Sequence, residues 1–246
     1  MSFATFYDPD LGTPAPGARF SLTGAEARHA VSVRRIRVGE SVEIVDGRGG
    51  RMRGQVRSAD KSALEIQVEH LRREEPPAAR ILLVQALAKG GRDEAAIEAA
   101  TEVGVNGVIA WESARSVSQW RGEKSAKGLA RWEGILTSAM KQSRRAYLPE
   151  LRGFARGEQV TDLLPAGAGV LILHEAATTP LTAAELPETG TIAVVVGPEG
   201  GLTDGELEMF ARIPGAQQVL LGREVVRTST AGPAALAVLN ARLGRW

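Results

Sequence analysis

Two short glycine-containing segments near the end of the chain are the residues best suited to chemistry. Residues 197–201 read Gly-Pro-Glu-Gly-Gly after the apolar run 191–196, and residues 220–222 read Leu-Leu-Gly after Val219. An apolar run that stops at glycine or proline is typical of a strand buried in a parallel sheet. Ligands of such sheets bind beyond the carboxyl ends of the strands, where glycine lets the backbone come close. We therefore expect both segments to line one small-molecule site; two ordinary strand-to-helix turns are the alternative.

The sequence lacks the local signatures of most other enzyme classes. It contains no cysteine and only three histidines, which excludes a thiol nucleophile and leaves no pattern for a metal site. Glycines 47, 49 and 50 follow a predicted strand but have the wrong spacing for a dinucleotide-binding loop. Neither a Walker A sequence nor a Gly-x-Ser-x-Gly elbow occurs. We therefore expect no metal cofactor and no site of these hydrolase classes.

Clustered arginines predict contact with a polyanion, although the net charge is only +1. The two main clusters consist of Arg28, Arg34, Arg35 and Arg37, and of Arg48, Arg51, Arg53 and Arg57. The planar guanidinium suits phosphate and stacks on bases, so RNA is a fitting partner. A solvated surface in an arginine-rich protein is the alternative reading of either cluster.

The elements that must position these residues begin with a β-rich part. Short runs at residues 3–7, 41–45, 52–56 and 63–68 predict strands, and Asp46-Gly47 predicts a hairpin turn. The pair Thr23 and Glu26 has the spacing of a capping box and predicts a short helix that ends at Val33. Several short strands with one helix predict a small barrel.

The pattern changes after the charged, proline-containing segment 72–77, which we interpret as a linker. Strands are predicted at residues 81–87, 107–111, 170–173, 191–196 and 219–221, and helices at 93–103, 125–145, after the capping box Thr203–Glu206, and at 229–243. Pro233 is expected within the first turn of the last helix. The alternation predicts an α/β domain with a mainly parallel, covered sheet.

Several segments together resemble the RsmE family of the SPOUT superfamily. They are Gly197-Pro-Glu-Gly-Gly201, Leu221-Gly222 with Val226-Arg227-Thr228 and Thr230-Ala231, His29 with Arg34-Arg35, Ala100-Thr-Glu-Val-Gly-Val105, and Gln142-Ser-Arg-Arg145. They lie in order along nearly the whole chain, at the spacing of that family. The resemblance implies a PUA-like β-barrel that binds RNA in residues 1–72, and a SPOUT-type methyltransferase domain with a trefoil knot in residues 73–246.

The resemblance also implies the reaction. Members of this family transfer a methyl group from S-adenosylmethionine to N3 of a uridine in small-subunit (16S) ribosomal RNA, within an assembled or assembling subunit. It further implies a homodimer. The composition itself predicts a cytoplasmic, metal-free protein with no membrane partner, because the sequence has no cysteine, no apolar run of about 18 residues and no signal peptide pattern at its start. The run 234–239 in the last predicted helix is apolar nearly all round, which favours burial on two sides and hence a second chain. A helix buried wholly within its own domain is the alternative.

Carried over residue by residue, the resemblance gives two sets of site residues. The expected cofactor-binding residues are Leu173, Gly197, Pro198, Glu199, Gly200, Gly201, Leu220, Leu221, Gly222, Val225, Val226 and Thr230. The expected RNA-binding residues are His29, Arg34, Arg35, Arg37, Gln142 and Arg145. For Gln142 and Arg145, surface salt bridges are the alternative role.

Two residues are expected to serve the reaction itself. Arg227 suits the stabilisation of negative charge on a uracil carbonyl, because the N3 proton must leave; a phosphate contact or a helix-end ion pair is its alternative. Glu199 suits a ribose hydroxyl or the charge of the cofactor, with a helix cap as its alternative. No residue stands out as a general base. Glu224, Ser229 and Lys141 depart from the family pattern, so a non-catalytic RNA-binding module with a degenerate methyltransferase domain is the rival hypothesis.

Overall fold

The structure is a computed structural model that describes residues 3–246. The chain forms two compact units, each of which is described by itself below. The first unit comprises Met1–Pro76 and the returning segment Met140–Leu148, and the second comprises Pro77–Ala139 and Pro149–Trp246. The predicted division after residue 72 does not include this returning segment.

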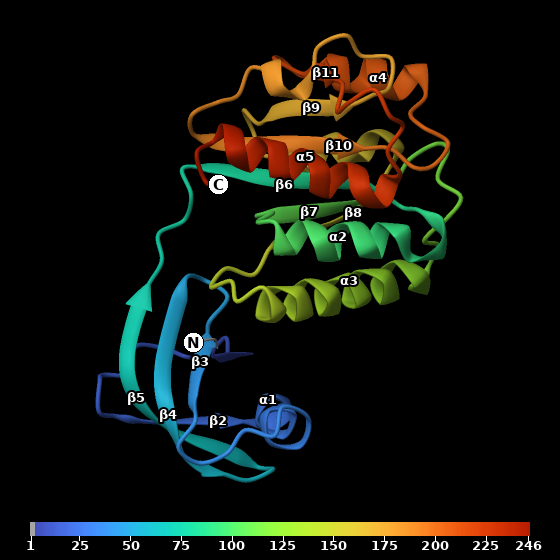
Figure 1. The fold of residues 1–246 in the computed structure, drawn as a ribbon. Coiled ribbons are helices and arrows are strands. Elements are labelled where there is room, and N and C mark those ends of the chain that lie inside the picture. Colours follow the sequence, from blue (N-terminus) through green and yellow to red (C-terminus); the bar gives the residue numbers. More distant parts are fainter. Residues whose placement is uncertain (1–2) are drawn as a thin grey trace. The chain divides into compact units, whose positions relative to one another are not determined.

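The first unit is built on a five-stranded sheet (Figure 1). Its strands are β1 (Ala4–Tyr7), β2 (Arg19–Thr23), β3 (Ser41–Val45), β4 (Gly50–Ala59) and β5 (Ala63–Arg73), in the order β1-β3-β4-β5-β2. Strand β1 pairs with β3 in parallel, and the other pairs are antiparallel. The alternation of the sequence turns Phe6, Ile44, Met52 and Ile66 into one buried core. The predicted strands and hairpin are therefore present, and β5 extends through Arg73 into the predicted linker.

A short helix, α1 (Gly24–Arg28), continues into a π-helical turn, η1 (His29–Val33). The predicted helix and its end are correct, but the predicted capping box is wrong. The side chain of Thr23 makes no capping hydrogen bond. Instead, the Glu26 carboxylate accepts the N–H of Tyr7 at 3.2 Å and pairs with Lys141 Nζ at 2.6 Å. This carboxylate thus joins helix, sheet and returning segment.

The returning segment packs into the first unit through apolar and polar contacts. Met140 and Ala146 form a small core with Val45. The buried Arg51 guanidinium donates to the backbone oxygen of Arg144 at 2.8 Å and pairs with Glu43 at 2.8 Å. Because both ends of this guanidinium are occupied, it serves the fold of the first unit.

The second unit contains a six-stranded sheet in which every neighbouring pair is parallel. The strands are β6 (Ala79–Ala86), β7 (Gly107–Glu112), β8 (Glu150–Arg156), β9 (Gly169–Leu173), β10 (Gly190–Val196) and β11 (Gln217–Val219), in the order β11-β9-β10-β6-β7-β8. The predicted parallel α/β sheet is confirmed. Strand β8 was not predicted, and β11 begins and ends two residues before the predicted strand.

Helices cover both faces of this sheet (Figure 1). Helices α2 (Arg92–Glu102) and α5 (Thr228–Arg242) pack together on one face. Helix α4 (Asp204–Ala211) and the 3-10 turn η3 (Gly157–Leu163) lie on the other, where Phe210 meets the buried Trp111 edge to face at 5.5 Å. The remaining elements are α3 (Glu123–Gln142) and the short turns η2 (Lys89–Gly91) and η4 (Leu181–Ala183).

The first residues of α4 and α5 test two predictions about where these helices begin. Thr203 and Glu206 form the predicted capping box at α4, with reciprocal hydrogen bonds of 3.3 and 2.8 Å. Pro233 lies inside α5, beyond its first turn, so that prediction is wrong. Within the described residues, no helix is both long enough and apolar enough to cross a membrane.

Candidate cofactor site at the carboxyl edge of the sheet

The two predicted glycine segments follow β10 and β11, which lie on either side of β9 and end at the same edge of the sheet. Strand β9 lies between β10 and β11, and Leu173 at its end is in register with Val219. Beyond β11, Leu220 exchanges hydrogen bonds of 2.8 Å with the loop after β9, through Thr179 and Leu181. The structure therefore brings Leu173, the loop 197–201 and the segment 220–222 to one edge, as predicted from the sequence.

A buried polar clasp ties the first glycine loop to two other elements. The Thr228 hydroxyl, at the start of α5, donates to the backbone oxygen of Gly197 at 2.8 Å. Gln85 Nε2, from the end of β6, donates to that hydroxyl at 2.9 Å. Gln85 is 0% exposed and Thr228 6%. No role was predicted for Gln85, although a glutamine within the apolar run 81–87 was a signal.

A second clasp reaches the same loop from the segment after β7. Arg115 Nη1 donates to the backbone oxygens of Gly200 and Leu202, at 2.9 and 3.2 Å. A Cβ atom on Gly200 would lie 3.1 Å from the Cβ atom of Arg115, so the two residues are closely packed. Beside it, the Ala114 N–H donates to the Glu206 carboxylate at 2.8 Å. Arg115 was not predicted, because no local pattern links it to a loop 85 residues away.

The loop itself folds as a tight turn. The Gly201 N–H donates to the backbone oxygen of Pro198 at 2.9 Å. Gly201 has a φ of +70°, which only glycine adopts without strain. The Gly-Pro-Glu-Gly-Gly sequence therefore sets the shape of the loop, and Thr228 and Arg115 fix its position.

Glu199 projects from this loop toward the segment after β6. Its carboxylate pairs with Arg92 at 2.8 Å and accepts the N–H of Lys89 at 3.3 Å. Partial burial raises the pKa of this carboxyl, but hydrogen bonds from its own N–H, Arg92 and Lys89, with the charge of Arg92, hold the pKa below its ordinary value. Since Thr203 and Glu206 cap α4, the helix-cap alternative for Glu199 does not apply.

The segment between Gly222 and Thr228 is open to solvent. Val225 is 83% exposed, and Gly222, Glu224 and Arg227 are also exposed. Arg227 precedes the clasp residue Thr228, and its backbone oxygen accepts the N–H groups of Thr230 and Ala231 at 2.8 and 2.9 Å. The backbone of Arg227 therefore lies at the carboxyl edge, next to Thr228, which contacts Gly197. Val226 is half-buried and Thr230 exposed.

The two arginine clusters of the first unit differ in whether their guanidinium groups have partners. Arg51 and Arg53 pair with Glu43 and Glu69, at 2.8 and 3.4 Å, and Arg57 donates to Gln67 at 2.9 Å. The exposed residues of the other cluster that were predicted to bind RNA are Arg34, Arg35 and Arg37. Among residues 3–246, no carboxylate lies within ion-pair distance of their guanidinium groups.

The other predicted RNA-binding residues also lie in the first unit. His29 is half-buried and meets the Phe6 ring edge to face at 6.3 Å. Gln142, the last residue of α3, is exposed. Arg145 is half-buried, and burial lowers the pKa of its guanidinium to about 10. The structure thus places all six predicted RNA-binding residues in the first unit and all predicted cofactor residues in the second.

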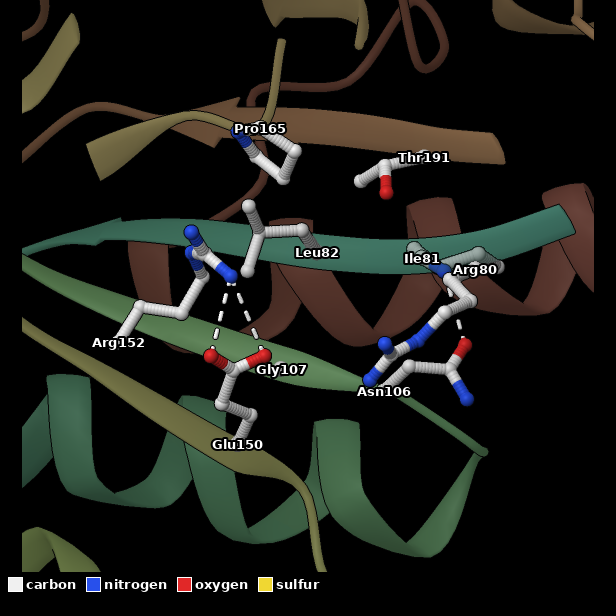
Figure 2. A pocket seen from close by; sticks show the side chains of 9 residues that line it. All are labelled: Arg80, Ile81, Leu82, Asn106, Gly107, Glu150, Arg152, Pro165 and Thr191. Carbon is white, nitrogen blue, oxygen red and sulfur yellow. Dashed lines mark hydrogen bonds and ion pairs between the residues drawn. The ribbon is translucent and has the colours of Figure 1, made fainter. Parts of the chain in front are cut away.

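One pocket of about 150 Å³ lies at the opposite, amino edge of the parallel sheet (Figure 2). It is lined by Arg80, Ile81, Leu82, Asn106, Gly107, Glu150, Arg152, Pro165 and Thr191. Arg152 faces Glu150 across 3.0 Å, as Figure 2 shows. None of the predicted site residues borders this pocket. Since ligands of parallel sheets bind at carboxyl ends, the glycine loops, and not this pocket, are the candidate cofactor site.

Comparisons with known proteins agree with this geometry. Residues 74–240 match the family model of an RNA methyltransferase domain, and residues 22–69 match that of an RNA methyltransferase PUA domain. A protein of Mycobacterium bovis, named ribosomal RNA small subunit methyltransferase E, is 41% identical over 95% of this chain and 90% of its own. The enzyme of that name from Bacillus subtilis is 28% identical over 90% and 89%.

Solved structures are similar over almost the full length. The ribosomal RNA small subunit methyltransferase E of Neisseria gonorrhoeae, bound to S-adenosylmethionine, has a TM-score of 0.86 at 28% identity, with 98% of both chains covered. A Legionella pneumophila methyltransferase with the same bound cofactor has a TM-score of 0.85 at 27% identity, with the same coverage. Two matched domains, the parallel sheet and the glycine loops at its carboxyl edge lead to one conclusion: the chain belongs to the ribosomal RNA small subunit methyltransferase E family.

Proposed function

We propose that this protein transfers a methyl group from S-adenosylmethionine to N3 of a uridine in small-subunit ribosomal RNA. The observation that carries the proposal is the pair of clasps that hold one glycine loop at the carboxyl edge, from Thr228 and from Arg115. Methyl transfer is an in-line displacement, which depends on alignment of the two reactants more than on covalent catalysis. A loop fixed from both sides suits that requirement.

The residues at this edge fit the cofactor. A Cβ atom on Gly222 would find nothing closer than Glu224 Oε2 at 3.8 Å, so the backbone there leaves room for a flat group such as adenine. The backbone of residues 197–201 and 220–222 would hold the adenine and ribose, with Leu173 and Val226 as apolar neighbours. When bound, S-adenosylmethionine supplies an electrophilic methyl group on a sulfonium ion.

The polar residues have separate roles in the proposal. Glu199 is kept ionised by Arg92 and Lys89, and a ribose hydroxyl or the cofactor's positive charge would face this carboxylate. Arg227 stabilises the negative charge that develops on a uracil carbonyl as the N3 proton leaves, by the logic of an oxyanion hole. Val225, Thr230 and the backbone of Leu220 and Leu221 complete the cofactor contacts.

The two units divide the work in this proposal. The RNA-binding domain is residues 1–72 and the methyltransferase domain is residues 73–246. The second domain binds the cofactor, and RNA is bound through His29, Arg34, Arg35, Arg37, Gln142 and Arg145. A ribosomal RNA substrate supports a cytoplasmic location, which is part of the proposal. The threaded trefoil knot belongs to this proposal too, on the resemblance to the SPOUT superfamily.

A homodimer is also part of the proposal. In α5, Ala235, Leu236 and Leu239 are buried, whereas Ala234 and Val238 are only half-buried and remain available to a partner. A second copy of the chain would cover this stripe, since two-fold pairing is the commonest assembly. Light scattering at micromolar protein concentration tests it: a fully active monomer would contradict the dimer.

Two measurements test the proposed function against the non-catalytic alternative. Titration calorimetry with S-adenosylmethionine should show micromolar binding, and no binding would favour the RNA-binding module. Mass mapping of small-subunit RNA from a strain lacking this protein should reveal one uridine without its methyl group. That group should return with the wild-type protein and should not return with an Arg227→Ala variant.

A further inference from the structure

The segment that follows the π-helical turn of the first unit is unusual in its exposed apolar residues. Val33 is 66% exposed and Val38 64%. They flank Arg34, Arg35 and Arg37, whose exposed guanidinium groups form no ion pair within residues 3–246; the Glu40 carboxylate accepts the backbone N–H of Arg37 at 3.3 Å. We call residues 33–38 the tip. Large exposed apolar residues beside cations without an ion-pair partner indicate a binding surface, because the apolar side chains gain nothing from contact with water and the cations attract an anionic partner.

The backbone of the tip is arranged to expose these residues. The Arg34 N–H donates to the backbone oxygen of His29 at 3.0 Å, and the Ile36 N–H donates to that of Ala30 at 3.0 Å. This pattern needs a left-handed residue between them, a position that glycine usually fills after a helix. Here it is Arg35, with a φ of +55°. An arginine at such a position accepts backbone strain, which persists mainly at functional sites.

The turn at Arg35 also decides which side chain enters the core. Ile36 is 8% exposed and packs with the core residues of the sheet. Its neighbours on both sides stay outside. The tip is thus anchored by one buried isoleucine, while two valines and three arginines are presented together.

We propose that the tip binds unstacked nucleobases of RNA, with Val33 and Val38 against base faces and Arg34, Arg35 and Arg37 on neighbouring phosphates. This inference rests on the proposed function and names the RNA element that the first unit recognises. A paired duplex hides its base faces and offers a groove too narrow for side chains, whereas loops and bulges splay their bases out. Phosphates alone would explain the arginines but would leave both valines in water.

The test compares two labelled RNAs by fluorescence anisotropy with the full-length protein. One is a hairpin with a single-stranded loop, and the other is a fully paired duplex of equal length. The wild type should bind the hairpin more tightly. The double variant Val33→Ser, Val38→Ser should bind the hairpin at least about tenfold more weakly, because it loses two valine contacts and a single fully buried one accounts for about that factor. Its affinity for the duplex and its melting temperature should stay unchanged, because both side chains are exposed.

A backbone variant separates function from fold. Arg35→Gly should keep or raise the melting temperature, because glycine adopts the positive φ without strain. It should nevertheless weaken hairpin binding and reduce the salt slope by roughly 0.7, the value for one lost phosphate contact on a single strand. Arg57→Ala is the matched control, since Arg57 pairs with Gln67 on the same sheet; it should leave both readouts unchanged.

Three results would overturn the inference. The first is that the double valine variant binds the hairpin with wild-type affinity. The second is that its affinity falls equally for hairpin and duplex. The third is that its affinity falls only for assembled subunits, which would indicate that the tip contacts a ribosomal protein instead. Methyl transfer by the wild type, measured in parallel with labelled S-adenosylmethionine, separates the two levels. If the wild type transfers no methyl group, the proposed function fails; if it does and the valine variants bind normally, only the role of the tip fails.

Discussion

Replacing Arg115 by methionine tests whether the position of the glycine loop 197–201 depends on the hydrogen bonds from Arg115. The change removes a cation that donates to the backbone oxygens of Gly200 and Leu202, at 2.9 and 3.2 Å, while keeping the unbranched aliphatic stem. A hydrogen bond to a charged group contributes about 1.5–3 kcal/mol, and the exposure of Arg115 favours the lower end. A loss of about 1.4 kcal/mol corresponds to a tenfold weaker affinity for S-adenosylmethionine.

Titration calorimetry measures that affinity directly, and RNA binding by anisotropy serves as the second readout. Affinity for the cofactor should fall, while affinity for RNA should not change, because Arg115 lies in the second unit. Arg115→Lys should recover part of the loss, since an ammonium can still donate to one of the two oxygens. Arg121→Met is a matched control: Arg121 pairs with Glu112 at 3.2 Å in the same segment without contacting the glycine loop.

The clearest refutation would be normal cofactor affinity in Arg115→Met together with a lower melting temperature, which would show a purely structural residue. An equal loss in Arg121→Met would show that the whole segment, and not this pair of hydrogen bonds, positions the loop.

Other expected results concern the cofactor edge and the reaction. Gly222→Val should abolish cofactor binding with little change in melting temperature, because the new side chain has open space in the protein alone; normal binding in calorimetry would place the cofactor elsewhere. Arg227→Ala should lower turnover by roughly 2.7–4 kcal/mol, as for a lost oxyanion-hole donor, with unchanged cofactor affinity; unchanged single-turnover rates would remove Arg227 from the mechanism. The pKa of Glu199 lies below 4.5 in the folded protein, so its pairing with Arg92 stabilises the loop above pH 4.5 and is lost as the pH falls through the lower folded value. Thermal melts of wild type and Glu199→Gln should therefore differ near neutral pH and converge in acid; a constant difference would refute this.

The sequence predicted the elements that rest on local patterns. Apolar runs in β6, β7, β9 and β10 predicted buried parallel strands. The alternating runs of the first unit predicted four of the five strands of its sheet, and the edge strand β2 was not predicted. Strand β8 was missed because its residues Leu151 and Phe154 are only half-buried and Gly153 interrupts the run. It is an edge strand, and an edge strand carries a weaker apolar signal than a central one.

Two identical motifs show why local patterns have a limit. Thr203 and Glu206 form a capping box, whereas Thr23 and Glu26, at the same spacing, do not. Glu26 instead pairs with Lys141, which is 115 residues away. The partner of this carboxylate is distant in the sequence, so the residues around the motif could not predict the ion pair.

The same limit applied to the candidate site. The glycine loops were found because glycine and proline mark strand ends, but the residues that hold them were not. Gln85 acts on the loop through Thr228 from the end of β6, and Arg115 reaches it from the segment after β7. Only the sheet order brings these residues together. The topology of the sheet thus decides which side chains hold the glycine loop, whereas the glycine and proline residues of the local sequence decide where the loop forms.

The hydrogen bond from Gln85 to Thr228 spans 143 positions of the chain, which has a consequence for when the protein becomes competent. During synthesis, the strands β6 to β10 are made before residue 228. The loop 197–201 therefore lacks its hydrogen bond from Thr228 until almost the whole chain has been made. Such non-local closure slows folding, since chain entropy is lost before the contact is gained. A chain that ends before α5 should therefore collapse without a cofactor site, and binding of S-adenosylmethionine would report complete synthesis.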